Sequence, residues 1–261
     1  MARVDPPAPG GSPRLASATR RGVRGPGWVP NQHGAWAMLA SPLLVGALAA
    51  GPSWVHLPLA AFWFAGYFAF FASSLWLKSR RRPRYLPPVR AYAAAAAALG
   101  LVTLAAEPRL ARWAPLFVLP LGIGLWAAAR RRERELVTGL VTVLGSALMT
   151  VVAYDAGHGG DFRRAWLLTL VQLLYFAGTL FYVKSAIRER GSPAFLALSV
   201  GVHAVAAAVL WPVSPWLTLV FAVLALRAWL VPRRGLTPKT LGVGEIVATV
   251  VVALAALLVV P

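Results

Sequence analysis

Nine long apolar stretches follow one another along the chain, separated by short segments that carry most of the charged residues. The stretches lack the alternation of apolar and polar positions that marks a membrane β-strand. Each is close to the length of about 20 residues that a helix needs to cross a bilayer, where helices satisfy their own backbone hydrogen bonds. The pattern predicts an all-α membrane protein with about nine transmembrane helices, near 34–50, 57–77, 91–106, 113–129, 135–154, 165–183, 194–211, 214–231 and 241–260.

The composition supports this interpretation. Hydrophobic residues make up 59% of the 261 residues and charged residues only 13%, about half the ~25% that is usual in a soluble domain. The mean hydropathy of +0.67 agrees. These values exclude a soluble enzyme, a secreted disulfide-stabilised domain and a disordered chain. Because the chain has no cysteine, disulfides, thiol nucleophiles, zinc thiolates and iron–sulfur clusters are excluded as well.

The basic residues are unevenly distributed between the predicted loops. Of the 26 Lys and Arg residues, 22 lie in or beside the N-terminal tail and the even-numbered loops, and the other four are Arg109, Arg112, Arg163 and Arg164. The positive-inside rule therefore puts the N-terminus in the cytoplasm and, with nine spans, the C-terminus outside. Residues 1–27 are predicted to be a disordered basic cytoplasmic tail that lies against anionic lipid head groups. Since topology accounts for the net charge of +18, no nucleic-acid partner is expected.

Polar residues at membrane depth are costly, so they are the first candidates for a functional site. Gln32 and His33, at the start of the first helix, face a substrate or, alternatively, belong to a helix cap with an interfacial histidine. At the cytoplasmic end of the second helix, the spacing of Tyr67, Ser74 and Lys78 puts them on one face. The alternative there is a positive-inside anchor with snorkelling side chains.

The sixth predicted helix carries a polar stripe on an otherwise apolar sequence. Four polar side chains spaced three or four residues apart are followed by two cations: Gln172, Tyr175, Thr179, Tyr182, Lys184 and Arg188. This spacing puts the four polar groups on one helix face. It predicts either the lining of a cavity or a set of contacts between helices.

Glu245 is the one acidic residue of the ninth predicted helix, about one turn from its start. It is either an interfacial carboxylate paired with Lys239 or Arg234, or a buried ion-pair partner of Lys78 or Lys184. The glycines at positions 242 and 244 permit close helix packing beside it.

The second and sixth helices end alike, with Leu75-Trp76-Leu77-Lys78-Ser79 and Phe181-Tyr182-Val183-Lys184-Ser185. The two Lys-Ser pairs are four predicted helices apart. A parallel pseudo-repeat of four helices, about 33–130 and 135–231, accounts for this, with 241–260 as an added ninth helix in one transmembrane domain over 28–261. The two Lys-Ser ends are then expected to face one another across a cytoplasmic cavity.

Two family resemblances rest on these segments. PNQHGAWAM (30–38) and FYVKSAIRER (181–190) resemble the YwiC-like family of bacterial membrane proteins, from about Trp28 to the C-terminus. This resemblance implies a multi-pass protein of the bacterial plasma (inner) membrane. More remotely, the architecture resembles the UbiA superfamily of intramembrane prenyltransferases, which have nine helices and motif-bearing cytoplasmic ends on helices two and six. That resemblance implies a UbiA-like bundle with a cytoplasm-facing cavity for an isoprenoid ligand.

The chain departs from the UbiA pattern in its acidic residues. UbiA-type enzymes hold Mg²⁺ with Asp-rich motifs on helices two and six, but no Asp or Glu occurs here between Asp5 and Glu107, and the sixth helix offers only Glu189. No metal site and no cofactor are therefore predicted, and the four histidines lack ligand spacing. In place of Asp and Mg²⁺, Lys78 and Lys184 are expected to bind an anionic head group directly.

Three functions remain in competition. The first is a bundle that binds an anionic lipidic or isoprenoid ligand through the two lysines, with or without catalysis. The second is a transporter or channel for a small anion, since internal repeats and membrane-embedded polar groups also characterise secondary transporters. The third is a non-enzymatic membrane assembly protein, in which the polar stripe makes contacts between helices. Neither the ligand nor the oligomeric state follows from the sequence.

Overall fold

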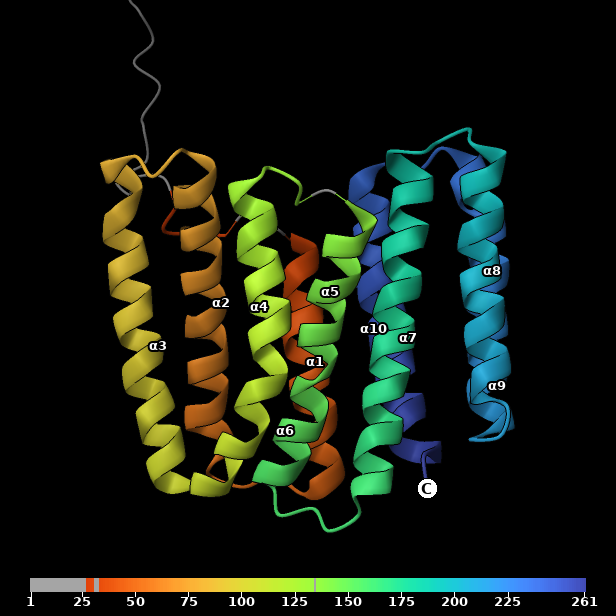
Figure 1. Cartoon of the computed structure of the whole chain (residues 1–261). Coiled ribbons are helices and arrows are strands. Elements are labelled where there is room, and N and C mark those ends of the chain that lie inside the picture. Colours follow the sequence, from red (N-terminus) through yellow and green to blue (C-terminus); the bar gives the residue numbers. More distant parts are fainter. Residues whose placement is uncertain (1–26, 31–32, 134) are drawn as a thin grey trace, which may run out of the picture.

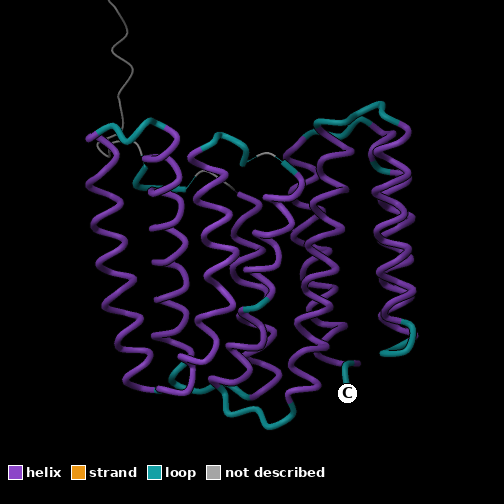
Figure 2. Tube along the Cα trace, viewed as in Figure 1, coloured by secondary structure: helices purple, strands orange, loops and turns teal. Residues whose placement is uncertain are grey.

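The structure is a computed structural model that describes residues 27–30, 33–133 and 135–261. All regular elements in these ranges are helices (Figures 1 and 2). They are α1 His33–Ala50, α2 His56–Lys78, α3 Leu86–Ala106, α4 Ala114–Ala129, α5 Leu136–Ala147, α6 Met149–Ala156, α7 Phe162–Ile187, α8 Pro193–Leu210, α9 Pro215–Leu230 and α10 Pro238–Val259, with short 3-10 helices η1 Pro83–Tyr85, η2 Pro108–Trp113 and η3 Pro232–Arg234. The predicted tail, except Gly27, lies outside the described residues.

The prediction of nine spans is confirmed within the described part of the chain. Eight helical stretches are long and apolar enough to cross a membrane, and α1 is a shorter apolar helix. The fifth predicted span consists of two helices, because the chain turns at Leu148 between α5 and α6. The protein is therefore an all-helical, multi-pass membrane protein.

Four helical stretches form the centre of the bundle. The stretch α5–α6 has 61% of its apolar window buried inside the protein and α7 has 50%, whereas the other membrane-length helices have 28% or less. Both pack against α1, and α10 packs against α1 and α7. Helices α2, α3 and α4 cover one side of this centre and α8 and α9 the other (Figure 1). The most buried stretches of the described bundle are thus α5–α6 and α7, with α1 and α10 packed against them.

The contact between α1 and α6 requires a glycine. A Cβ atom at Gly46 would lie 2.2 Å from the backbone oxygen of Thr150 and 2.9 Å from the Cβ of Ala153. Glycine alone permits so close an approach of the two helices. All eight residues of α6 are buried, so this short helix is enclosed by its neighbours.

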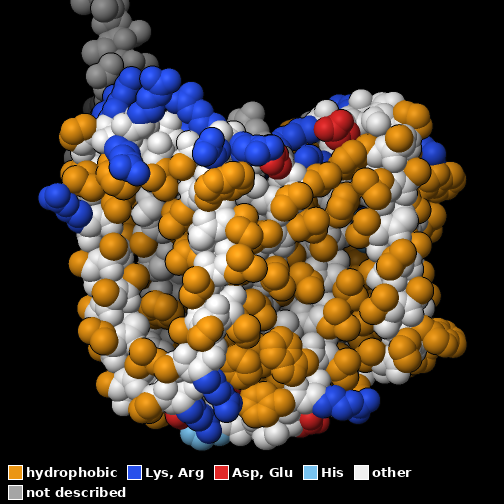
Figure 3. Space-filling model, in the orientation of Figure 1, with side chains coloured by type: hydrophobic (Ala, Val, Ile, Leu, Met, Phe, Trp, Pro, Cys, Tyr) orange, Lys and Arg blue, Asp and Glu red, His pale blue; other side chains and the backbone are white. Residues whose placement is uncertain are grey.

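Charged residues gather at the two ends of the bundle, as Figure 3 shows. The loops α2–α3, α4–α5, α7–α8 and α9–α10 lie at one end, which we call the basic face because most of the lysines and arginines lie there (Figures 1 and 3). The other end, the opposite face, carries the loops before α2, α4, α7 and α9, and the C-terminus. The orientation of these two faces in a membrane stays a prediction of the positive-inside rule.

Candidate functional site

Part of the polar stripe on α7 meets a carboxylate from α10. Glu245 Oε2 accepts a hydrogen bond from Thr179 Oγ1 at 2.9 Å and lies 3.4 Å from the donating hydroxyl of Tyr175. The same Tyr175 hydroxyl lies 2.9 Å from Thr249 Oγ1, one turn further along α10. The i, i+4 spacing of Tyr175 with Thr179 and of Glu245 with Thr249 puts the two pairs on facing helix surfaces. The stripe therefore makes specific polar contacts inside the bundle.

The cation beside this carboxylate comes from α9. Arg227 Nη2 lies 2.7 Å from Glu245 Oε1, and the guanidinium stacks over the Tyr182 ring at 4.3 Å from its centroid. Only 19% of the Arg227 side chain and 13% of the Glu245 side chain are exposed. The predicted partners of Glu245 were wrong, because the structure pairs it with Arg227 and not with a lysine or Arg234. We call Tyr175, Thr179, Tyr182, Arg227, Glu245 and Thr249 the inner cluster.

Several buried polar atoms at and beside the inner cluster lack hydrogen-bond partners among the described residues. Arg227 Nε has none. The ion pair between Arg227 Nη2 and Glu245 Oε1, at 2.7 Å, is not aligned as a hydrogen bond. On α8, the Nδ1 of His203 donates to the Ser199 carbonyl at 2.8 Å, while Nε2 of this 1% exposed ring is unbonded. The ring faces Gly178 of α7, where a Cβ would lie 2.8 Å from Nε2. Such atoms are rare in protein interiors and commonly mark a ligand, water or ion.

Gln172, the innermost residue of the stripe, belongs to a different contact. Its side chain is fully buried, and its Oε1 accepts from Ser41 Oγ of α1 at 2.9 Å, while Nε2 has no partner in the described structure. The stripe predicted from helical spacing thus divides into one residue that faces α1 and three that face α9 and α10.

A cavity of about 390 Å³ opens at the basic face between the end of α7, the start of α8 and η3. Its walls include Ser185, Glu189, Arg190, Leu196 and Arg233. Ser185 follows Tyr182 by one turn on the same face of α7, so the cavity is next to the inner cluster on the side of the basic face. Its volume is within the range of about 300–1,000 Å³ that holds small ligands in proteins.

The two predicted lysines have separate surroundings. Lys78 forms an ion pair with Glu133 of the α4–α5 loop, in the α2–α4 part of the molecule. Lys184 lies 6.0 Å from the centroid of the Phe195 ring on α8. Arg188 is exposed at the end of α7. Whether the lysines bind a common ligand stays a prediction.

The other predicted residues lie nearer the first two helices. The Tyr67 ring is 6.3 Å from that of Trp36, and Ser74 Oγ is buried without a hydrogen-bond partner among the described residues. Gln32 lies outside the described residues, and of His33 only its backbone position at the start of α1 is described. The predictions for these two residues are thus untested.

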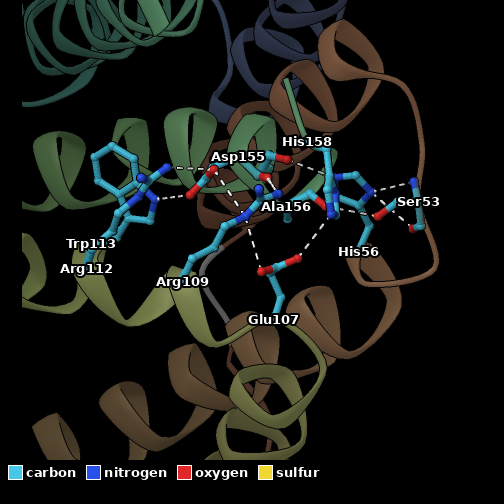
Figure 4. A network of polar contacts seen from close by, with 10 residues as sticks. Ser53, His56, Glu107, Arg109, Arg112, Trp113, Asp155, Ala156 and His158 are labelled. Atoms are coloured by element: carbon cyan, nitrogen blue, oxygen red, sulfur yellow. Dashed lines mark hydrogen bonds and ion pairs between the residues drawn. The ribbon is translucent and has the colours of Figure 1, made fainter. Parts of the chain in front are cut away.

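The opposite face holds a second network of charges, which Figure 4 shows from close by. Asp155, at the end of α6, is 2% exposed and accepts from Trp113 Nε1 at 2.7 Å. Arg112 Nη2 lies 2.7 Å and Arg109 Nε 3.6 Å from the same carboxylate. Glu107 bridges Arg109 and His158 at 3.2 Å each. We call Glu107, Arg109, Arg112, Trp113, Asp155 and His158 the opposite-face network.

The end of α6 is also satisfied by side chains from other elements. The carbonyls of Ala153, Asp155 and Ala156 accept from His56 Nε2 at 2.8 Å, Arg109 Nη2 at 2.8 Å and Ser53 Oγ at 3.1 Å (Figure 4). The last carbonyls of a helix have no partners within it, so a buried helix end requires such donors. The network therefore closes the opposite end of the central bundle.

Three residues of these sites were not predicted as such from the sequence: Asp155, Arg227 and His203. Arg227 was counted only among the basic residues that indicate membrane topology, and no role was predicted for Asp155. One signal was available, because Asp155 stands at the end of an apolar span on the side where Arg109, Arg112, Arg163 and Arg164 lie.

The fold and these contacts define a multi-pass, all-helical membrane protein with a buried charged site between its helices. A sequence model described as YwiC-like protein matches residues 29–154. A protein of Bacillus subtilis (strain 168), named "Uncharacterized protein YwiC", is 34% identical over 226 residues, which cover 84% of this chain and 92% of the relative. An "Uncharacterized protein" of Haemophilus influenzae is 27% identical over 229 residues, or 85% and 94% of the two chains.

The chain therefore belongs to the YwiC-like family. No solved structure matches it.

Proposed function

We propose that the protein binds the anionic head group of a lipidic or isoprenoid ligand at its basic face, with Arg227 as the innermost cation. The observation that carries this proposal is the state of Arg227. It lies in a membrane-spanning helix, is mostly buried, and has one carboxylate beside it, while its Nε donor is unbonded in the described structure. A guanidinium has five N–H donors and suits phosphate and carboxylate oxygens, so donors remain for an anion.

The cavity at the basic face gives such a head group a route towards Arg227. Arg190 and Arg233 line it, and Leu196 adds an apolar wall. Two of the Arg190 donors are already bonded to the carbonyls of Ala186 and Leu236, which leaves part of its guanidinium for a ligand. The proposal keeps Lys184 as a cation on the same side and assigns no role to Mg²⁺. A UbiA-like arrangement of the helices is part of this proposal.

The test is ligand binding to the detergent-purified protein with and without Mg²⁺. The probes are farnesyl diphosphate, short-chain phosphatidylglycerol and a neutral lipid of equal chain length. Arg233→Ala and Arg227→Gln are compared with Arg163→Ala, which removes the same charge from an exposed position on the opposite face. We expect metal-independent binding of the anionic probes, weakened at least tenfold by the first two substitutions only. Equal binding by all variants, or no binding of any anionic probe, would contradict the proposal.

A non-enzymatic assembly role is the second candidate, because one observation favours it. The hydroxyls of Tyr175, Thr179 and Thr249 are all bonded within the bundle, as expected for contacts that hold helices together. Interhelical hydrogen bonds in membranes are worth only about 0.6 kcal/mol on average, so such contacts need no further role. A stable partner that co-purifies with the protein, together with no anion binding, would favour this function over ligand binding.

A further inference from the structure

We infer that Glu245 is a proton-binding site, and that the protein takes up one proton together with each anion that binds beside Arg227. This inference rests on the proposed function. It follows from the position of Glu245 against one guanidinium and two hydroxyl groups inside the bundle.

The first step concerns charge. Arg227 is the one cation within ion-pair distance of Glu245 in the described structure, at 2.7 Å. An anion bound to the same guanidinium adds a second negative charge next to a carboxylate that is 13% exposed. Like charges at a buried site disfavour the ionised form of a carboxyl group. Uptake of a proton by Glu245 removes this repulsion and leaves one anion opposite one cation.

The second step concerns hydrogen bonding. Glu245 Oε2 accepts from Thr179 Oγ1 at 2.9 Å, and it lies 3.4 Å from the Tyr175 hydroxyl, which is also 3.1 Å from the Glu245 backbone carbonyl oxygen. A hydroxyl both donates and accepts, so it donates to a carboxylate and accepts from the O–H of a carboxylic acid. The neutral form of Glu245 therefore keeps its partners without any movement of the helices. Fixed donors, such as backbone N–H or guanidinium groups, can bond only to the oxygen of a neutral carboxyl group that carries no proton.

The third step concerns the alternatives for the proton. Glu245 is the only Asp or Glu in helices α7 to α10. The helices packed against α10 are α1, α7 and α9, and α1 has no charged residue from Gly34 to its end. Glu189 lines the adjoining cavity but is exposed. The other ionisable groups around the cluster and the cavity are tyrosines, cations and one histidine: Tyr175, Tyr182, Lys184, Arg190, His203, Arg227, Arg233, Arg234 and Lys239. Protonation of His203 would add a fourth charge to those of Arg227, Glu245 and the anion, whereas protonation of Glu245 removes one.

The experiment measures how many protons the protein takes up for each anion that it binds. Calorimetric titrations of the purified protein are run at one pH in two buffers of different ionisation enthalpy, with short-chain phosphatidylglycerol or inorganic sulfate as probe. Both probes stay fully ionised across neutral pH, so any proton taken up is bound by the protein. We expect one proton per bound anion, and an affinity that falls as pH rises. A sulfate response equal to that of the lipid would mean that the anion alone suffices.

Two variants make the result specific. Glu245→Gln should bind without proton uptake and without the pH dependence. Glu135→Gln, which removes an exposed carboxylate at the basic face, should behave as wild type. Anion binding by the wild type without proton uptake would overturn this inference and leave the proposed function standing. No binding by any variant would overturn the proposed function itself. If Glu245→Gln does not fold, the proton count of the wild type still decides.

Discussion

The two most deeply paired carboxylates of the described bundle, Asp155 and Glu245, lie near opposite faces and have different kinds of partners. Asp155 is surrounded by Arg109, Arg112 and the indole of Trp113, which only donate. Glu245 has one arginine and two hydroxyls. Partners that only donate are fixed in that role, whereas a hydroxyl group can either donate or accept. The comparison indicates that Asp155 fixes the structure at the opposite face, whereas the hydroxyl partners of Glu245, nearer the basic face, can change between donating and accepting.

The polar groups around the two carboxylates also differ in how completely they are hydrogen-bonded. At the opposite face, three carbonyls at the end of α6 have side-chain donors from outside the helix. At the inner cluster and on the adjoining α8, donors and acceptors of Arg227 and His203 are buried and unbonded in the described residues. Unbonded buried polar groups cost stability, about 1–3 kcal/mol each. Such a cost is expected where a ligand completes the hydrogen bonds.

Neutralising each carboxylate in turn tests this difference most directly. Asp155→Asn removes the charge opposite two arginines that are 38% and 48% exposed, so we expect a loss of about 2–3 kcal/mol, below the 3–5 of a fully buried pair. Glu245→Gln should cost more, about 3–5 kcal/mol, because it leaves the guanidinium of Arg227, which is only 19% exposed, without a counter-ion. The measurement is the free energy of unfolding in a denaturant titration of the micelle-bound protein. Equal losses for the two variants would contradict the comparison.

A second test concerns the rigid side of the bundle. Gly46→Ala puts a methyl group 2.2 Å from the Thr150 carbonyl oxygen, and since that atom belongs to the backbone, α1 and α6 must move apart. Overpacking of this kind costs about 1–3 kcal/mol. The control is Gly66→Ala on α2, where no atom lies within 4 Å of the new methyl group, and where stability should be unchanged or slightly higher. Equal stability of the two variants, measured in the same titration, would show that α1 and α6 can separate freely.

The helices could be predicted from sequence because the signal is local. Each span is a continuous apolar run, and helical spacing alone indicated that Tyr175, Thr179 and Tyr182 share a face. The partners of that face could not be predicted in the same way. Arg227 and Glu245 come from two other helices, and Trp113 and Asp155 are 42 residues apart. Which helix packs against which depends on long-range contacts such as that at Gly46, and no local pattern encodes them.

Tyr175→Phe tests whether the inner cluster holds the bundle together. The substitution removes the hydroxyl that contacts Glu245 and Thr249 and keeps the ring, which packs at 4.9 Å from that of Phe176. We expect a loss of about 0.6 kcal/mol, the average for a hydrogen bond between membrane helices. Thr169→Val is a suitable control, because the Thr169 hydroxyl bonds only within its own helix in the described structure. A loss above about 2 kcal/mol for Tyr175→Phe would favour the assembly function.

The two lysines predicted to bind a ligand together provide the last and smallest test. Lys78 is paired with Glu133, and its side chain is 44% exposed, so Lys78→Ala should change stability by less than about 1 kcal/mol. Lys184→Ala should be equally mild for stability, but it should weaken binding of farnesyl diphosphate, because Lys184 lies two residues beyond Tyr182 at the same end of α7, beside α8. Lys78 belongs to the other side of the bundle, and its charge is already opposed by Glu133, so its removal should leave the affinity within about twofold, or 0.4 kcal/mol. Equal weakening by both substitutions would restore the two-lysine arrangement expected from the repeated Lys-Ser ends, and would bring α2 into the binding site.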